Sequence, residues 1–126
     1  MTCKPGDLIG IPFPYSDLTT KKRRPVLVLT SPDRHRDFVC LAVTSVPTIE
    51  VAVAIDHKSM ETGRLPMRSW IRCDKIFTLS EHIIAKNYGT LRDTALQDVM
   101  ERVCKYLGCI RDFEDYENLN PCNSPG

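Results

Sequence analysis

Long hydrophobic segments are absent from this sequence. No apolar run approaches the ~18 residues that a transmembrane helix requires, and the first residues lack the charged and apolar pattern of a secretory signal peptide. We therefore expect a cytoplasmic protein with no membrane partner. Internal repeats are absent as well, and the 126 residues predict a single domain with a core of its own.

Cysteine pairs of the metal-binding type are also missing, although the chain contains six cysteines. There is no C-x-x-C pair, and Cys104 and Cys109 lie five residues apart near the end of a predicted helix. Cys40 and Cys73 stand inside apolar segments of strand length, where buried free thiols are common. The pattern predicts reduced structural thiols and no metal site, and we expect no cofactor.

A strong net charge is the third missing feature. Seventeen basic residues face sixteen acidic ones, for a net charge of +1 at pH 7. Such a balance does not by itself predict a nucleic-acid partner, which must be argued from local clustering. Clustering is present, because residues 21–36 contain six Lys or Arg and one acid, whereas residues 101–117 contain five acids.

The basic cluster leads into two predicted strands within the stretch from Lys21 to Val46. The apolar runs 26–29 and 38–43 flank a turn sequence rich in Ser, Pro and Asp. If the two runs pair as antiparallel neighbours, the beginning of the first lies beside the end of the second, which places Arg24 near Thr44. A guanidinium beside a hydroxyl, with more cations in the preceding loop, suits a phosphodiester better than a neutral metabolite.

Further short strands are predicted on both sides of this hairpin. Alternation and turn residues place them at Asp7–Phe13, Val51–Ile55, Ser69–Ile76 and, as an edge strand, Ala85–Leu91. His57–Leu65 is expected to form a loop, and Leu79–Ile84 a short helical turn or bend. These elements predict a mainly β, mostly antiparallel small barrel.

One helix is predicted near the end of the domain, at about residues 94–107. Thr94 and Gln97 have the spacing of a capping box, and Gly108 is placed to end the helix in the left-handed conformation. Apolar residues recur at helical spacing on one face, namely Leu96, Val99, Met100, Val103 and Leu107. We expect this helix to cover one opening or face of the barrel in a domain of residues 1–110, with 111–126 as a polar tail.

Several short motifs follow one another in a fixed order over residues 4–108. They are Gly6-Asp7, Pro12-Phe13-Pro14-Tyr15-Ser16-Asp17, Arg24-Pro25-Val26-Leu27-Val28-Leu29, Ala42-Val43-Thr44-Ser45, Ser69-Trp70-Ile71-Arg72, Lys75-Ile76-Phe77-Thr78-Leu79 and Leu107-Gly108. The ordered set resembles the MazF/PemK family of mRNA-interferase toxins. That resemblance implies an SH3-like barrel of the MazF/PemK/CcdB type, usually a homodimer, which cuts single-stranded RNA without a metal and is inhibited by a small antitoxin.

The resemblance also implies which residues form the site. In the family, the Arg before the Pro of the second strand and the Thr or Ser that ends the third carry catalysis, and these positions are Arg24 and Thr44 here, with Ser45 as the weaker alternative. The residues expected to contact RNA are Lys21, Lys22, Arg23, Tyr15, Ser16, Asp17, Ser45 and Ser69. Among them, Lys22 and Arg23 suit flanking phosphates and Tyr15 suits a base.

The chemistry explains why these residue types are suitable. Metal-free cleavage uses the neighbouring 2′-hydroxyl as nucleophile and leaves a cyclic phosphate and a 5′-hydroxyl end. A guanidinium stabilises the charge that grows on the phosphorus oxygens. Arg24 is too basic to act as the general base, which the sequence does not identify, and Thr44 is expected to orient the phosphate or the 2′-hydroxyl.

Other interpretations stay open at this point. A basic loop before a strand is often a solvated surface, Thr44 at a strand end can simply bond backbone, and Trp70 fits a core or a dimer interface better than a base. The histidines His35, His57 and His82 lie in separate polar segments and are expected at the surface. The alternative functions are a non-enzymatic toxin that acts on a protein such as gyrase, and a decayed homologue that only dimerises or binds antitoxin.

The first loop departs from many members of the family. It is a proline-rich and Lys/Arg-rich version rather than the longer glycine-rich one. The preferred cleavage sequence therefore does not carry over, and the tail after Cys109 has no counterpart in the family.

Overall fold

The protein is described by a computed structural model over residues 1–12 and 23–109. Its elements in chain order are β1 (Asp7–Pro12), β2 (Arg23–Val28), β3 (Asp37–Thr44), β4 (Ala52–Ile55), the 3₁₀ turn η1 (His57–Ser59), β5 (Met60–Gly63), β6 (Ser69–Ser80), the 3₁₀ turn η2 (Glu81–Ile83), β7 (Lys86–Leu91) and α1 (Asp93–Leu107). Within these ranges no helix is long and apolar enough to cross a membrane. The predicted tail, residues 111–126, lies outside the described residues.

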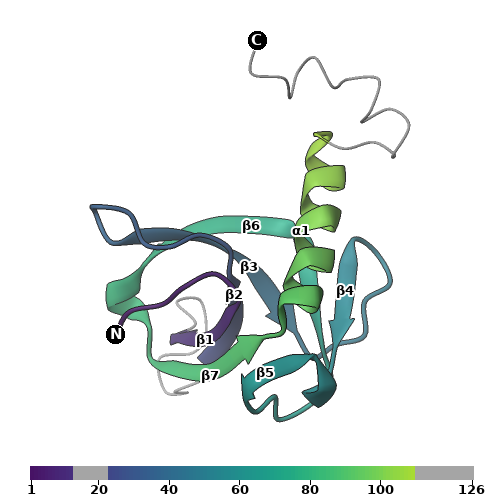
Figure 1. The fold of residues 1–126 in the computed structure, drawn as a ribbon, viewed down its shortest axis with the longest axis horizontal. Helices are drawn as coiled ribbons and strands as arrows, with labels where there is room; N and C mark the ends of the chain where they lie inside the picture. Colours follow the sequence, from purple (N-terminus) through teal and green to yellow (C-terminus); the bar gives the residue numbers. More distant parts are fainter. Residues whose placement is uncertain (13–22, 110–126) are drawn as a thin grey trace.

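All seven strands join one curled sheet in the order β4-β6-β3-β2-β1-β7-β5, and every pairing is antiparallel. The sheet wraps round an interior, and α1 packs against β4 and β6 (Figure 1). The predicted fold class is therefore confirmed: a mainly β structure with one C-terminal helix. The described part is a half-barrel rather than a closed barrel, because β4 and β5 are edges.

Two hydrophobic cores lie on opposite sides of the central strands. Leu8 and Leu27 belong to the larger core, which α1 completes with Val99 and Val103. Their chain neighbours point the other way into a smaller core built from Cys3, Ile9, Ile11, Val26, Val28, Phe38, Cys40 and Ile84. Because both faces of β1 and β2 are buried, these strands read as continuous apolar runs instead of alternating ones.

Two expectations about the later strands are wrong. The predicted loop His57–Leu65 contains η1 and β5, and β7 lies between β1 and β5 instead of at an edge. The reason is a close approach of two glycines: a Cβ on Gly63 would lie 2.1 Å from the Tyr88 carbonyl oxygen, and one on Gly89 would lie 2.2 Å from the Thr62 oxygen. The sequence of β5 carries no alternation that signals a strand.

Other strand bounds differ from the predicted ones only at their ends. β6 continues to Ser80, so the predicted bend at Leu79–Ile84 is reduced to η2. β2 begins at Arg23, before its apolar run, because Pro12 and Ile11 of β1 pair with Arg23 and Arg24. Phe13, the predicted end of the first strand, lies outside the described residues.

The helix spans nearly the predicted residues, but its N-terminal cap differs from the predicted one. Its N-cap is Arg92, without any capping side chain, so the Thr94 capping box is not formed. Tertiary contacts hold this end instead, because the Arg92 guanidinium donates to the Lys58 carbonyl oxygen at 3.0 Å and pairs with Glu61 at 3.0 Å. Gly108 ends the helix at φ 85°, as predicted.

The apolar face of α1 is narrower than its sequence suggests. Val99 and Val103 are buried, and Leu96 packs on the larger core. Met100 is 37% exposed and Leu107 is 62% exposed, so these two members of the predicted apolar face are not buried.

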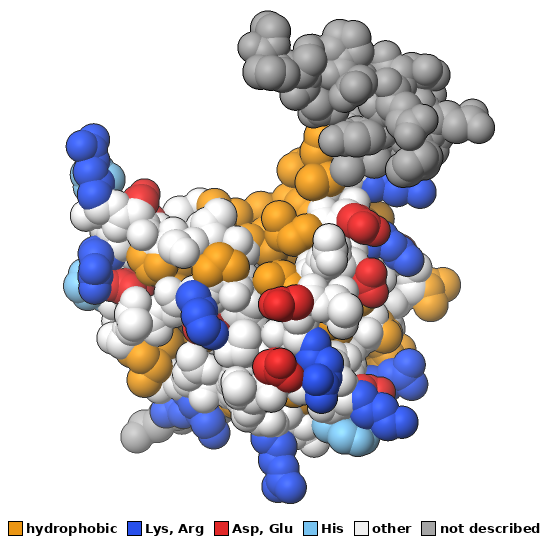
Figure 2. Space-filling model, in the orientation of Figure 1, with side chains coloured by type: hydrophobic (Ala, Val, Ile, Leu, Met, Phe, Trp, Pro, Cys, Tyr) orange, Lys and Arg blue, Asp and Glu red, His pale blue; other side chains and the backbone are white. Residues whose placement is uncertain are grey.

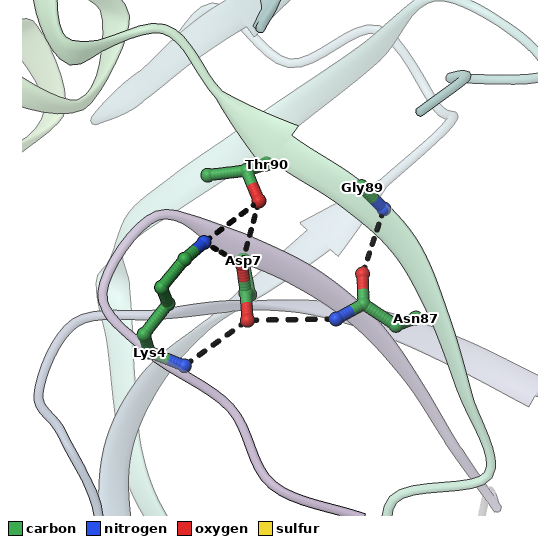
Figure 3. Close-up of polar contacts among 5 residues, drawn as sticks. All are labelled: Lys4, Asp7, Asn87, Gly89 and Thr90. Atoms are coloured by element: carbon green, nitrogen blue, oxygen red, sulfur yellow. Dashed lines mark hydrogen bonds and ion pairs between the residues drawn. The ribbon is translucent and has the colours of Figure 1, made fainter. Parts of the chain in front are cut away.

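A buried carboxylate joins the start of β1 to β7. The Asp7 side chain is 5% exposed and pairs with Lys4 Nζ at 3.0 Å. Thr90 Oγ1 donates to Asp7 Oδ1 at 2.7 Å, and Asn87 Nδ2 donates to Oδ2 at 3.4 Å (Figure 3). The Lys4 backbone N–H also donates to Oδ2. Every Asp7 lone-pair direction thus leads to a donor on β7 or on the leader, which is the segment of residues 1–6 before β1.

Three cysteines are buried in the two cores, which confirms the prediction for Cys40 and Cys73 and adds Cys3. Burial raises the pKa of the Cys3 thiol to about 11, that of Cys40 to about 12 and that of Cys73 to about 11. The five cysteines in the described ranges carry free thiols. Cys104 is half-buried and Cys109 is exposed.

Thiol labelling tests this assignment. In native protein at pH 8 we expect Cys3, Cys40 and Cys73 to resist iodoacetamide, because the thiolate is the reactive form and these thiols stay protonated below their raised pKa values. Their labelling should rise only as the pH nears 11 or when guanidinium unfolds the chain. Peptide mass spectrometry locates the labelled sites, and rapid native labelling of Cys40 at pH 8 would contradict the packing.

The Asp7 network predicts a stability effect. Asp7→Asn removes the charge and turns two acceptor oxygens into one acceptor and one donor that faces other donors. We expect the free energy of unfolding in urea to fall by about 1.5–3 kcal/mol, the usual contribution of hydrogen bonds to a charged group. Asp98→Asn, on the exposed face of α1, is the matched control and should leave it unchanged; equal effects of the two variants would show that the network does not stabilise the fold.

Candidate active site

The register of the central hairpin brings Arg24 and Thr44 together. Val26 pairs with Ala42. Continued by two residues along each strand, this register sets Arg24 opposite Thr44, and both residues line one cavity. Directly opposed residues of an antiparallel pair point to the same face of the sheet. The arrangement expected from the sequence is thus present in the structure, whereas the catalytic roles of the two residues remain predictions.

A cavity of about 360 Å³ lies at the ends of β2 and β3. Its polar lining comes from Arg23, Arg24, Thr44, Ser45, Ser69 and Tyr88. Pro25 and Val43, which point to the opposite face from Arg24 and Thr44, line it too. The cavity therefore opens at the end of the hairpin instead of over one face of the sheet.

The Thr44 hydroxyl oxygen already accepts one hydrogen bond within the protein. Thr44 Oγ1 accepts a hydrogen bond from the Val46 N–H at 3.1 Å, which shapes the turn after β3. The structure thus contains the backbone contact expected of a hydroxyl at a strand end. Thr44 is half-buried, and its hydroxyl hydrogen has no acceptor in the described part of the chain, so it can still donate to a ligand oxygen.

The other predicted RNA contacts fall into three groups. Arg23 and Ser45 are exposed and line the cavity. Ser69 lines it as well but is only 4% exposed, and its hydroxyl donates to the Met67 carbonyl oxygen at 3.1 Å, which leaves it only as an acceptor. The remaining predicted contacts lie outside the described residues: Tyr15, Ser16, Asp17, Lys21 and Lys22.

Trp70 lies beside the candidate pair. On β6 it pairs with Thr44 on one side and with Ala54 of β4 on the other. The indole is half-buried on the same face as Thr44, and the Arg68 guanidinium carbon lies 5.7 Å from its ring centroid. Trp70 is not a member of either buried core, which overturns a core role for it.

Sequence reading missed Tyr88, which β7 contributes to the cavity. The Lys86 ammonium lies 5.1 Å from the Tyr88 ring centroid. An aromatic residue directly before a glycine in a predicted strand was the available signal. Nothing in the sequence indicates that β7 lies next to β1, and this pairing is what brings Tyr88 to the site.

The charged side chains that line the cavity are those of Arg23 and Arg24. Elsewhere, on the face shown in Figure 2, Lys and Arg side chains mix with Asp and Glu, so no field of one sign covers that face. His35, His57 and His82 are exposed, as predicted, and none of them lines the cavity. Within the described ranges, no three His, Cys, Asp or Glu residues gather closely enough to hold a metal ion.

Several solved structures have a similar fold. An endoribonuclease in complex with its cognate antitoxin from a mycobacterial species superposes with a TM-score of 0.65 at 19% identity, over 86% of this chain and 97% of that one. A MazE–MazF complex from Deinococcus radiodurans gives 0.66 at 18% identity, with coverage of 86% and 97%. The Mycobacterium tuberculosis toxin MazF-mt6 gives 0.60 at 18%, with coverage of 80% and 95%.

Sequence comparison gives a second, independent result. No curated protein matches the chain significantly by direct comparison of sequences. A family model does match, over residues 4–107, and it describes PemK-like, MazF-like toxins of type II toxin–antitoxin systems. Since the match spans every described strand and the helix, the chain belongs to this PemK-like, MazF-like toxin family.

Proposed function

We propose that the protein is the toxin of a type II toxin–antitoxin system and cuts single-stranded RNA without a metal ion. The observation that carries the proposal is the meeting of Arg24 and Thr44 at one cavity on adjacent strands. Family membership and the likeness of the fold to an endoribonuclease support it. The expected products are a 2′,3′-cyclic phosphate and a 5′-hydroxyl end.

Each residue has a definite task in this reaction. The 2′-oxygen attacks phosphorus, the bond from phosphorus to the 5′-oxygen breaks, and the leaving oxygen takes up a proton. Arg24 donates hydrogen bonds to the non-bridging oxygens as their charge grows. The Thr44 hydroxyl donates to the phosphate or holds the ribose, and Arg23 and Ser45 hold a flanking phosphate.

The described lining of the cavity contains no carboxylate and no imidazole. Proton abstraction from the 2′-hydroxyl therefore has no obvious base among these residues. Catalysis in our proposal depends on positioning and on stabilisation of the charge at phosphorus. In a site of preorganised donors, both effects lower the activation barrier substantially.

Two protein partners complete the proposal. A small antitoxin places an acidic segment against the cations at the mouth of the cavity and excludes RNA, since carboxylates pair well with a guanidinium fork. A second copy of the chain forms a homodimer, as the family resemblance implies. The compartment we propose is the cytoplasm.

The alternative is a non-enzymatic toxin that acts on a protein target such as gyrase. A poison of that kind needs a docking surface but has no need of a guanidinium and a hydroxyl in register on adjacent strands. The Arg24–Thr44 pair therefore favours cleavage of RNA over binding to a protein target.

Cleavage of a long single-stranded RNA in EDTA tests the proposal. We expect discrete fragments with 5′-hydroxyl ends. Arg24→Ala should lower kcat about 100- to 1000-fold, the usual effect of losing one preorganised donor to an oxyanion. Arg34→Ala, in the turn at the far end of the same hairpin, is the matched control and should cut like the wild type.

Intact RNA across several sequence contexts, from protein shown to be folded by circular dichroism, would reject the nuclease. Activity that appears only with added divalent metal would reject the metal-independent mechanism. Equal losses in Arg24→Ala and Arg34→Ala would show that general charge, and not the site, is responsible.

Thr44 makes a separate prediction. Thr44→Val removes the hydroxyl and should lower kcat/KM about 10- to 100-fold, because a hydrogen bond to a charged group contributes about 1.5–3 kcal/mol. Thr44→Ser keeps the hydroxyl and should restore most of the rate, as measured on a short fluorogenic RNA. If Ser45→Ala abolishes cleavage while Thr44→Val does not, the catalytic hydroxyl belongs to Ser45.

A further inference from the structure

A β-bulge sets the position of Tyr88. In the pairing of β1 with β7, Leu8 stands opposite Gly89 and Ile9 opposite Asn87, so Tyr88 has no partner across the ladder. An extra residue of this kind bends its strand and re-aims its side chain, and bulges are frequent beside active sites. Here the re-aimed side chain reaches the cavity that Arg24 and Thr44 line.

The residues on both sides of the bulge are held. Asn87 Oδ1 accepts from the Gly89 N–H at 2.8 Å, which bridges Tyr88 along the chain. Asn87 Nδ2 donates to the buried Asp7 carboxylate at 3.4 Å, which ties the bulge to β1 (Figure 3). The position of Tyr88 is therefore built into the sheet.

Gly10 makes room for the ring. A Cβ at Gly10 would lie 2.9 Å from the Tyr88 hydroxyl oxygen and 3.1 Å from its Cε2. The φ angle of Gly10 is not in the left-handed region, so space and not conformation is the reason for glycine here. The hydroxyl end of the ring thus lies against Gly10 of β1, at the wall of the cavity.

The Tyr88 hydroxyl can still form a hydrogen bond with a ligand. Tyr88 is half-buried, and its hydroxyl has no hydrogen-bond partner in the described part of the chain. A phenol in a partly apolar wall normally finds such a partner. Leu8, Pro25, Val43 and Met67 supply the apolar wall of the same cavity.

We propose that this cavity is a nucleobase pocket and that Tyr88 reads the base next to the bond that Arg24 and Thr44 hold. The ring contacts the base, as aromatic side chains do in single-stranded RNA sites, and the hydroxyl bonds a base edge. The cations Arg23 and Arg24 at the mouth favour a nucleotide over an apolar ligand. Tyr88 is thus a specificity-determining residue, and this inference rests on the proposed function for the identity of its ligand.

A randomised single-stranded RNA pool, sequenced at its cut ends, tests the pocket. The wild type should show a base preference at one position beside the cut. In Tyr88→Ala that preference should fall at least tenfold while preferences elsewhere and the cut chemistry remain. Tyr88→Phe keeps the ring and should lose part of the preference, and Tyr106→Ala, an exposed tyrosine 52% accessible on α1, should lose none.

Gly10→Ala provides a second route to the same result if Tyr88→Ala folds poorly. The added methyl group displaces the ring without removing it, so the preference at that one position should weaken. An unchanged preference in both folded variants would overturn the proposal. A uniform loss of kcat/KM for all sequences would overturn it too, because that is the effect of a merely structural tyrosine.

Binding without cleavage separates this inference from the nuclease. Homopolymeric 2′-O-methyl RNAs of A, C, G and U cannot be cut, and the wild type should bind one of them at least fivefold more tightly than the weakest. Tyr88→Ala should reduce that ratio below twofold. This outcome supports the pocket even if no RNA is cut, whereas equal affinities for all four in the wild type would overturn it.

Discussion

The register of β2 against β3 is the constraint on which the site depends. A slip of one residue in a ladder turns every side chain to the other face, and it would place Arg24 and Thr44 on opposite sides of the sheet. Burial on both faces prevents such a slip. Leu27 belongs to one core and Val28 to the other, so a slip of one residue would exchange the side chains that fill the two cores. The apolar run that looks merely hydrophobic in the sequence is what aligns two polar side chains at its end.

A second constraint joins β7, which carries Tyr88 at the cavity, to the same central strands. Asp7 fastens the leader and β7 to the first residue of β1, and β1 pairs in turn with β2. Arg24 and Tyr88 therefore reach the cavity from strands that flank β1 on its two sides. The geometry of the candidate site is a property of four adjacent strands, in the order β3-β2-β1-β7.

Local signals explain what the sequence revealed and what it concealed. Residues close together in the sequence were sufficient to predict the hairpin, the left-handed Gly108 and the free buried thiols, and the structure contains all three. The start of α1 was predicted from a capping box, but Arg92 fixes it through contacts with residues about 30 positions away. The β5 strand and the bulge at Tyr88 depend on which strands become neighbours, and no window of the sequence contains that information. The proximity of Arg24 to Thr44 was predictable because one short hairpin carries both.

The glycine pair that lets β5 approach β7 has a consequence for mutational tolerance. Gly63 and Gly89 touch backbone to backbone, and the Tyr88 carbonyl between them accepts from the Arg64 N–H at 3.0 Å. Any side chain at either glycine pushes the two strands apart and carries Tyr88 with them. Positions that bear no functional group are therefore intolerant of substitution. Random mutagenesis scored by folding of the protein would recover both glycines, and geometry alone would account for their sensitivity.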